Sequence, residues 1–169
     1  MARIKIDYGI DLGTTNSAIC RMEGGIPMII KSDTLKDTMP SCVSFNRKKS
    51  VKVGDSGYND MKSDKRRATK SGKNTDSNTY IEFKRTMGSD TKYHSSYMER
   101  EFSSEELSAE VLKALKSFVQ DEQIKSAVIT VPAKFTASQN DATKRAAKLA
   151  GIEQVELLQE PIAASMAYG

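Results

Sequence analysis

The sequence predicts an α/β fold built around one mixed sheet. Over the first 30 residues, apolar and polar residues alternate between turn-forming residues, as in an antiparallel meander of strands. From residue 104 onward, helix and strand patterns alternate, which implies parallel strands joined by crossover helices. With 169 residues, the chain has the length of one domain or of two small lobes that share a core.

The N-terminal meander has a polar first turn that contains a glycine. In order, we expect a strand over residues 4–11, a loop over 13–17, a strand over 18–22, a turn at Gly24 and Gly25, and a strand over 26–30. Pro27 is compatible with the edge of a sheet or with the start of a strand. The middle of the chain gives a weaker pattern, with short strands over 43–45 and 51–54 and a loop over 70–78.

Two capping boxes mark helices in the C-terminal part of the chain. Ser103 pairs with Glu106, and Thr136 pairs with Gln139 in front of a helix that runs to a glycine stop at Gly151. Apolar residues of the first helix recur every three or four positions up to its expected end near Asp121: Leu107, Val111, Leu115 and Phe118.

Two further strands alternate with these helices. A β-branched run over 127–131, stopped by Pro132, predicts a buried strand. A second strand is expected over 155–158, and Glu160 with Pro161 then opens another helix, with the proline in its first turn.

Composition excludes several classes of protein. The longest apolar run is far shorter than the roughly 20 residues of a membrane span, and the N-terminus lacks the apolar stretch of a secretion signal. Two cysteines and one histidine cannot form a disulfide framework or the usual zinc clusters. We therefore expect a cytoplasmic protein that does not associate with membranes.

The positive net charge of +4 comes from one segment. Six of the 26 basic residues lie between positions 61 and 73, together with only one of the 22 acidic residues. The rest of the chain therefore carries 20 basic and 21 acidic residues. The basic residues of this segment are Lys62, Lys65, Arg66, Arg67, Lys70 and Lys73. The segment has no aromatic residue on which a base could stack, so a solvated loop or helix face explains it better than nucleic-acid binding.

The segment 11–17, with the sequence DLGTTNS, can bind phosphate or form an ordinary turn. A carboxylate at the end of a strand can hold a hydrated Mg²⁺, and small residues after it let backbone N–H groups close on phosphate oxygens. Gly, Thr, Asn and Ser also favour plain hairpin turns, so the residues alone leave both interpretations open. A Walker motif ending at Gly72 and Lys73 is excluded, because Arg67 stands at the first required glycine and Asn74 at the required Ser or Thr.

Further segments favour phosphate binding over an ordinary turn. With the segment 9–17, they occur in the order 38–41 (TMPS), 83–88 (FKRTMG), 127–133 (AVITVPA) and 159–169 (QEPIAASMAYG). Together these motifs closely resemble the heat-shock 70 (DnaK) chaperone family, from about residue 10 to residue 169. The resemblance implies the first lobe of an actin-like, ribonuclease H-like ATPase domain: a mixed five-stranded sheet with helices and a small inserted α+β subdomain. It implies a core subdomain of residues 1–41 and 104–169, with 42–103 as the insert.

The resemblance also implies roles for individual residues in binding and hydrolysing ATP. Asp11 would hold Mg²⁺ through water. The residues of the first phosphate loop would be Gly13, Thr14, Thr15 and Asn16. Lys84 would reach the γ-phosphate and the attacking water, and Glu160 would contact that water or the water shell of the metal. Pro132 resembles a switch proline that relays the nucleotide state. The cofactors would be ATP or ADP with Mg²⁺.

Some features depart from the common family pattern. The short connection between Arg85 and the helix at Leu107 resembles the shorter HscC-type members. Lys134 replaces an aromatic residue, and Asn140 replaces an arginine that couples the ATPase to substrate binding. A second phosphate loop, an adenosine motif and a substrate-binding domain have no counterpart in the sequence. We therefore expect a truncated first lobe that binds nucleotide weakly or not at all and hydrolyses none.

Three other functions remain as alternatives. They are a lobe of an actin-like sugar kinase, a nucleic-acid-binding module that uses residues 62–73, and a free-standing interaction domain that has lost the ATPase. For the main hypothesis, the expected partners are a second lobe and a substrate-binding domain of a longer protein, unfolded client proteins, a J-domain co-chaperone and a nucleotide-exchange factor. Nucleic acid is not among the partners that we expect.

Overall fold

The large sheet of the computed structural model, which describes residues 6–72 and 77–168, is mixed as predicted. Its strands are β1 (Tyr8–Leu12), β2 (Asn16–Glu23), β3 (Ile26–Ile29), β4 (Met39–Pro40), β10 (Ser126–Val131) and β11 (Gln154–Gln159). The order is β11-β10-β1-β2-β3, and β4 pairs with β2. Strands β1, β2 and β3 form the antiparallel meander, whereas β1, β10 and β11 run parallel. The described part of the sheet thus has the five expected strands and the two-residue strand β4 in addition.

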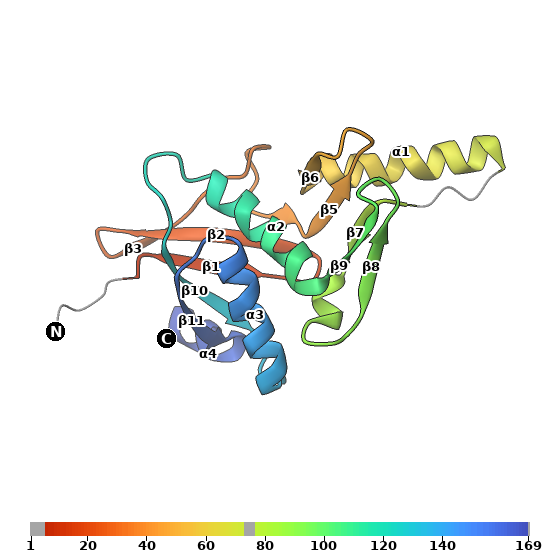
Figure 1. Ribbon diagram of the computed structural model, residues 1–169. Helices are drawn as coiled ribbons and strands as arrows, with labels where there is room; N and C mark the ends of the chain where they lie inside the picture. The colour runs from red at the N-terminus through yellow and green to blue at the C-terminus, as the bar shows by residue number, and fades with distance from the viewer. Residues whose placement is uncertain (1–5, 73–76, 169) are drawn as a thin grey trace.

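A smaller layer follows the meander in the sequence (Figure 1). It contains β5 (Cys42–Phe45), β6 (Val51–Val53) and β7 (Thr79–Ile81) in the order β6-β5-β7, and a separate hairpin of β8 (Lys92–Ser95) and β9 (Arg100–Ser103). Helix α1 (Asp55–Ser71) packs against β5 at its N-terminal end and extends away from the rest of the molecule. A short 3₁₀ helix, η1 (Phe83–Thr86), follows β7.

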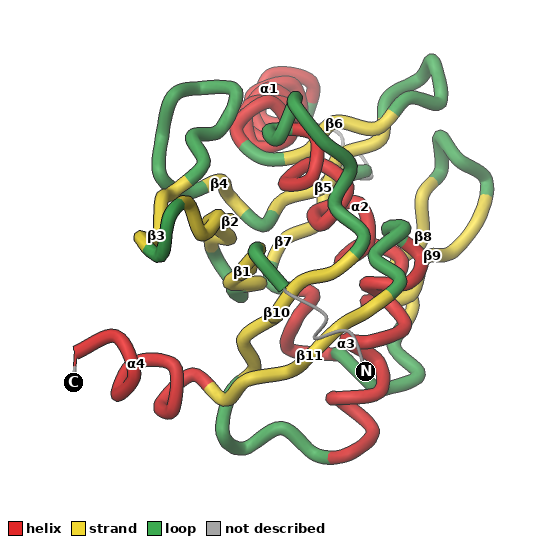
Figure 2. Tube along the Cα trace, turned by 90° about the vertical axis from the view of Figure 1, so that its left-hand side faces the viewer, coloured by secondary structure: helices red, strands yellow, loops and turns green. Residues whose placement is uncertain are grey.

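Three helices accompany the large sheet: α2 (Ser104–Ser117), α3 (Ala137–Leu149) and α4 (Glu160–Tyr168). Both predicted capping boxes are present, with Ser103 and Thr136 accepting from the third backbone N–H of α2 and α3. Helices α2 and α3 pack against each other, and α4 lies on the other side of β10 and β11 from α3 (Figure 2). The alternation of parallel strands with these helices confirms the crossover topology that the sequence predicts.

Several strand ends differ by a few residues from the sequence-based prediction, as at β1, which begins at Tyr8, and β2, which begins at Asn16 within the expected loop. Three larger differences concern helices α1 and α2 and the loop expected over 70–78. Helix α1 occupies a stretch with a weak pattern, because Gly57 is its one buried residue and no apolar stripe marks it. The loop expected over 70–78 is helical up to Ser71, and residues 73–76 lie outside the described part. Helix α2 ends at Ser117 rather than near Asp121, although Phe118 and Val119 still pack on the core.

One apolar core joins the large sheet to the smaller layer. Ile10 and Leu12 of β1 belong to the same cluster as Val43 and Phe45 of β5. The predicted apolar face of α2 is buried within this cluster at Leu107, Val111 and Leu115. Among the described residues, no helix is long and apolar enough to cross a membrane.

Candidate functional site

The predicted site residues gather at one edge of the large sheet. Strands β1, β10 and β11 are parallel, so their carboxyl ends lie at the same edge. The register pairs Asp11 with Thr130 across β1 and β10, and it pairs Val131 with Gln159 across β10 and β11. Pro132 and Glu160 follow directly after that second pair, so three sequence-predicted residues stand at the ends of three adjacent strands.

Asp11, the fourth of the five residues of β1, is exposed. The Thr130 hydroxyl donates a hydrogen bond to its Oδ1 at 3.1 Å and fixes the carboxylate on that side. Within the described part of the chain, Oδ2 accepts no hydrogen bond, so one oxygen is left for a metal-bound water. An exposed and oriented carboxylate of this kind fits a hydrated Mg²⁺, which keeps several of its waters in protein sites.

The loop between β1 and β2 is held by hydrogen bonds to two buried serines. Ser17 accepts a hydrogen bond from the Gly13 N–H at 3.2 Å, and Ser41 donates to the Gly13 carbonyl at 2.8 Å. The two hydroxyls are 2.8 Å apart, and the Ser41 N–H donates to the Thr15 carbonyl at 2.8 Å. Sequence reasoning did not assign this role to Ser41, which belongs to the motif over 38–41. Anchoring on both sides holds the loop in one shape.

Gly13 is required by the shape of this loop. A Cβ atom built on Gly13 would lie 1.9 Å from the carbonyl oxygen of Asn16, far inside van der Waals contact. Thr14 is half-buried, whereas Thr15 and Asn16 are exposed. The loop therefore turns tightly behind Gly13 and presents the side chains of Thr15 and Asn16 to solvent next to Asp11.

Lys84 and Glu160 meet although 76 residues separate them in the sequence. The Lys84 ammonium, on η1, donates to Oε1 of Glu160 at 3.3 Å. The lysine side chain is 7% exposed, whereas that of Glu160, at the first position of α4, is 45% exposed. The buried Lys84 thus places its ammonium group at the strand-end edge, where it forms an ion pair with the half-exposed Glu160 carboxylate.

Phe135 is a neighbour of Lys84 that sequence reasoning missed. The Lys84 Nζ lies 5.5 Å from the centroid of the Phe135 ring, within the range of a cation–π contact. Phe135 in turn donates its backbone N–H to the Pro132 carbonyl at 3.0 Å. The tight turn after β10 thereby connects Pro132, through Phe135, to the ammonium group. The only sequence signal for this contact was an aromatic residue three positions after the proline.

The structure thus forms two groups of predicted residues at one edge. One consists of Asp11 and the loop from Gly13 to Asn16, and the other of Lys84 with Glu160 and the turn after Pro132. In the described residues no direct bond joins the two groups, and no cluster of three or more His, Cys, Asp or Glu side chains could ligate a metal. Magnesium in this site would therefore be held mainly through its water shell, with Asp11 as the candidate carboxylate.

The family model described as Hsp70 protein matches residues 7–169. The chain belongs to the Hsp70 family. Three curated Hsp70 relatives, each named "Chaperone protein DnaK", are 36%, 38% and 39% identical to it; they come from Mycoplasmopsis agalactiae, Mycoplasmoides gallisepticum and Ureaplasma urealyticum. The matches cover 98%, 95% and 98% of this chain and 26% of each relative, so the chain spans about a quarter of their length.

The mixed α/β architecture agrees with the first lobe of an Hsp70 ATPase domain, as the motifs predicted. Membership of the Hsp70 family argues against the sugar-kinase alternative, since the match runs almost from one end of the chain to the other.

Proposed function

We propose that this chain is the N-terminal lobe of the ATPase domain of a DnaK-type molecular chaperone. The observation that carries the proposal is the pairing of Lys84 with Glu160 at the strand-end edge that also holds Asp11. A lysine, a carboxylate and a loop of backbone donors from three distant segments converge there, in a chain of the Hsp70 family. This combination suits phosphoryl transfer, which depends on positioning and on neutralising charge.

Each group has a chemical role in this proposal. In the loop from Gly13 to Asn16, Thr14, Thr15 and Asn16 bind phosphate oxygens through backbone N–H groups and the two threonine hydroxyls, and Gly13, whose N–H donates to Ser17, gives the loop its shape. Lys84 contacts the terminal phosphate, and Glu160 orients the attacking water. Asp11 holds the water shell of Mg²⁺, and the metal, when bound, neutralises charge on the phosphates. The turn of Pro132 and Phe135 relays changes at Lys84 to the end of β10.

The lobe divides into two subdomains in this proposal, and element boundaries support the division. Strand β4 ends at Pro40 and β5 begins at Cys42, whereas β9 ends at Ser103 and α2 begins at Ser104. We assign residues 1–41 and 104–169 to the core subdomain and 42–103 to the insert.

The other parts of the proposed chaperone would come from outside this lobe. A second lobe would close over the nucleotide, and hydrolysis would drive cycles of binding to unfolded client proteins in the cytoplasm, assisted by a J-domain co-chaperone and a nucleotide-exchange factor. Because donors on both sides of the phosphates must be preorganised, we expect the chain alone to hydrolyse no ATP.

A chimera tests the proposed site directly. The segment of the Ureaplasma urealyticum DnaK that matches this chain would be replaced by it, and single-turnover hydrolysis of Mg·ATP would be measured. We expect Lys84→Ala and Glu160→Gln to slow hydrolysis about a hundredfold or more. Thr14→Ala should mainly weaken nucleotide binding. Lys144→Ala, which removes an exposed lysine of α3, is the matched control and should leave the rate within about twofold.

Two results would contradict the proposal. One is a chimera that hydrolyses ATP at an unchanged rate after both the Lys84 and the Glu160 substitutions. The other is Mg²⁺-dependent phosphate release by the isolated chain above background, which would overturn the need for a second lobe. Calorimetric titration of both proteins with Mg·ADP separates loss of binding from loss of chemistry.

A further inference from the structure

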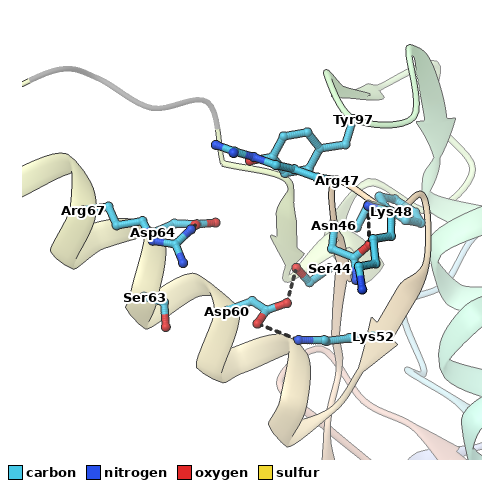
Figure 3. Close-up of a pocket in the computed structure, with 11 residues that line it drawn as sticks. Ser44, Asn46, Arg47, Lys48, Lys52, Asp60, Ser63, Asp64, Arg67 and Tyr97 are labelled. Atoms are coloured by element: carbon cyan, nitrogen blue, oxygen red, sulfur yellow. Dashed lines mark hydrogen bonds and ion pairs between the residues drawn. The ribbon is translucent and has the colours of Figure 1, made fainter.

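A hollow of about 400 Å³ opens between α1 and the β5–β6 hairpin (Figure 3). Its charged lining consists of Arg47, Lys48, Lys52 and Arg67, with Asp60 and Asp64. Tyr97, from the turn between β8 and β9, closes one side. Four cations and two carboxylates give the hollow a net positive charge, and none of these residues belongs to the strand-end site.

The carboxylates in the hollow are already matched by cations. Asp60 accepts a hydrogen bond from the Lys52 ammonium at 3.0 Å, and the buried Ser44 hydroxyl approaches its other oxygen at 3.5 Å. Asp64 lies 3.8 Å from the Arg67 guanidinium. In the described part of the chain, Lys48 has no ion pair, and Arg47 lies over the Tyr97 ring and is also attracted by the Asp64 carboxylate. The positive charge therefore exceeds what the protein itself neutralises.

Helix α1 carries further cations on a face other than the one that lines the hollow. Its Lys62, Lys65, Arg66 and Lys70 are exposed, and the half of the helix that carries them extends away from the molecule. Among the described residues, Lys65, Arg66 and Lys70 form no ion pair. Interaction with the helix dipole accounts for Lys70 in the last turn but not for the cations one and two turns earlier. These four residues do not line the hollow, and we call the charged hollow alone the basic groove.

The Tyr97 ring in the basic groove and the Tyr58 ring on another face of α1 are both covered by cations. The Arg47 guanidinium carbon lies 6.0 Å from the centroid of Tyr97, and the Lys62 ammonium lies 5.4 Å from that of Tyr58. Single-stranded nucleic acid binds through open aromatic faces that stack on its bases, and these two faces are occupied. The groove therefore suits separate carboxylates better than a nucleic-acid backbone.

We propose that the basic groove binds an acidic segment of a partner protein. Arginine binds carboxylates through paired hydrogen bonds, and Arg47 and Arg67 face the hollow from opposite sides. Four cations against two carboxylates give the groove a local excess of positive charge, which attracts an acidic segment. This inference does not depend on the proposed ATPase function.

Fluorescence anisotropy with defined probes tests the inference on the whole chain. The probes are a labelled peptide of alternating Glu and Ser, a matched peptide of Gln and Ser, and a labelled oligothymidine with the same net charge as the acidic peptide. Binding is measured at low and at physiological salt. The test variant combines Arg47→Gln with Arg67→Gln, and the control combines Lys144→Gln with Lys148→Gln on α3. Both remove two exposed charges, so a general effect of net charge would be equal in the two variants.

We expect the wild-type chain to bind the acidic peptide and not the Gln–Ser peptide. The Arg47→Gln, Arg67→Gln variant should weaken binding about tenfold, and the control should change it by less than about twofold. Equal weakening in both variants, or no binding of the acidic peptide at low salt, overturns the proposal. Tighter binding of oligothymidine that is lost in the test variant also overturns it and assigns the groove to nucleic acid. Circular dichroism melting of both variants checks that each remains folded.

Discussion

Gly13 illustrates how one residue determines the shape of the candidate site. The Asn16 carbonyl occupies the place where a side chain would begin, and both polar groups of the Gly13 backbone are bonded to buried serines. Any other residue must either move the Asn16 backbone or break those hydrogen bonds. The space for phosphate therefore depends on the close approach of Gly13 to the Asn16 carbonyl, which the motif alone does not reveal.

Gly13→Ala should lower the free energy of unfolding by about 1–3 kcal/mol, because the added methyl group collides with backbone rather than with a flexible side chain. Urea denaturation of the nucleotide-free chain measures this. Thr15→Ala, an exposed change in the same loop, should alter stability by less than about 0.5 kcal/mol. Equal effects of the two substitutions would show that the loop adapts easily.

Cys42 is a buried thiol whose chemistry is suppressed. Burial, with a smaller contribution from the Asp60 carboxylate, raises the pKa of Cys42 to about 12. The thiol stays protonated in the folded chain, so its contribution to stability is intact below the ordinary pKa near 8.5 and is lost as the pH rises toward 12. Because the thiolate is the reactive form, alkylation should be strongly suppressed.

We expect iodoacetamide at mildly alkaline pH to modify Cys42 more than about tenfold more slowly in the folded chain than in urea. Mass spectrometry of peptides containing each cysteine follows the reaction. Cys20, which is partly exposed, should show a smaller protection. Rapid alkylation of Cys42 in the native chain would mean that β5 opens readily.

At the level of elements, the helices with capping boxes were the most predictable. The α2 box contains a titratable Glu106, and the α3 box contains the uncharged Gln139. Burial alone would raise the pKa of Glu106, but hydrogen bonds from the Ser103 N–H and the Arg100 guanidinium outweigh it, so the pKa lies below its ordinary value near 4.5. The ionised carboxylate therefore stabilises the fold above that pH, and this contribution is lost as the pH falls through the lowered pKa.

Glu106→Gln should destabilise the chain at neutral pH, and the difference from wild type should shrink as the pH falls below about 4. Ser103→Ala should cost about 1 kcal/mol at neutral pH. Urea denaturation at several pH values checks both. Gln139→Ala is the internal control, since its cost should stay constant with pH. A Glu106→Gln difference that does not change with pH would contradict the assigned role of the charge.

Other elements were not predictable, for reasons visible in their residues. Helix α1 is mostly polar, so it lacks the periodic apolar face by which helices are recognised, and Gly72, which resembled part of a phosphate motif, is its left-handed C-cap. Residues Asp11 to Asn16 were predicted because they are adjacent in sequence. The contacts of Lys84 with Glu160 and Phe135 were not, because they depend on the tertiary arrangement of η1, α4 and the turn after β10.

At the scale of the whole molecule, the proposed core subdomain and insert share their apolar interior. Phe45 of β5 stacks on Phe102 of β9 with ring centroids 4.4 Å apart, and both belong to the cluster that contains Ile10 and Leu107. Helix α2 contacts β2 of the large sheet and β5 of the smaller layer. An insert that shares a core with its host cannot unfold by itself without exposing the apolar surface of the host.

We therefore expect one cooperative thermal transition, with equal calorimetric and van't Hoff enthalpies. Phe45→Ala should lower the free energy of unfolding by about 3 kcal/mol and shift the whole transition, because it leaves a cavity in the apolar cluster that the two subdomains share. Val51→Ala, an exposed change on the neighbouring strand β6, should have little effect. Hydrogen exchange under mildly destabilising conditions should show β1 and β5 losing protection together in the Phe45 variant. Two separate transitions, or loss of protection confined to β5, β6 and β7, would show that the insert folds as an independent unit and that the charged groove it carries can move relative to the strand-end site.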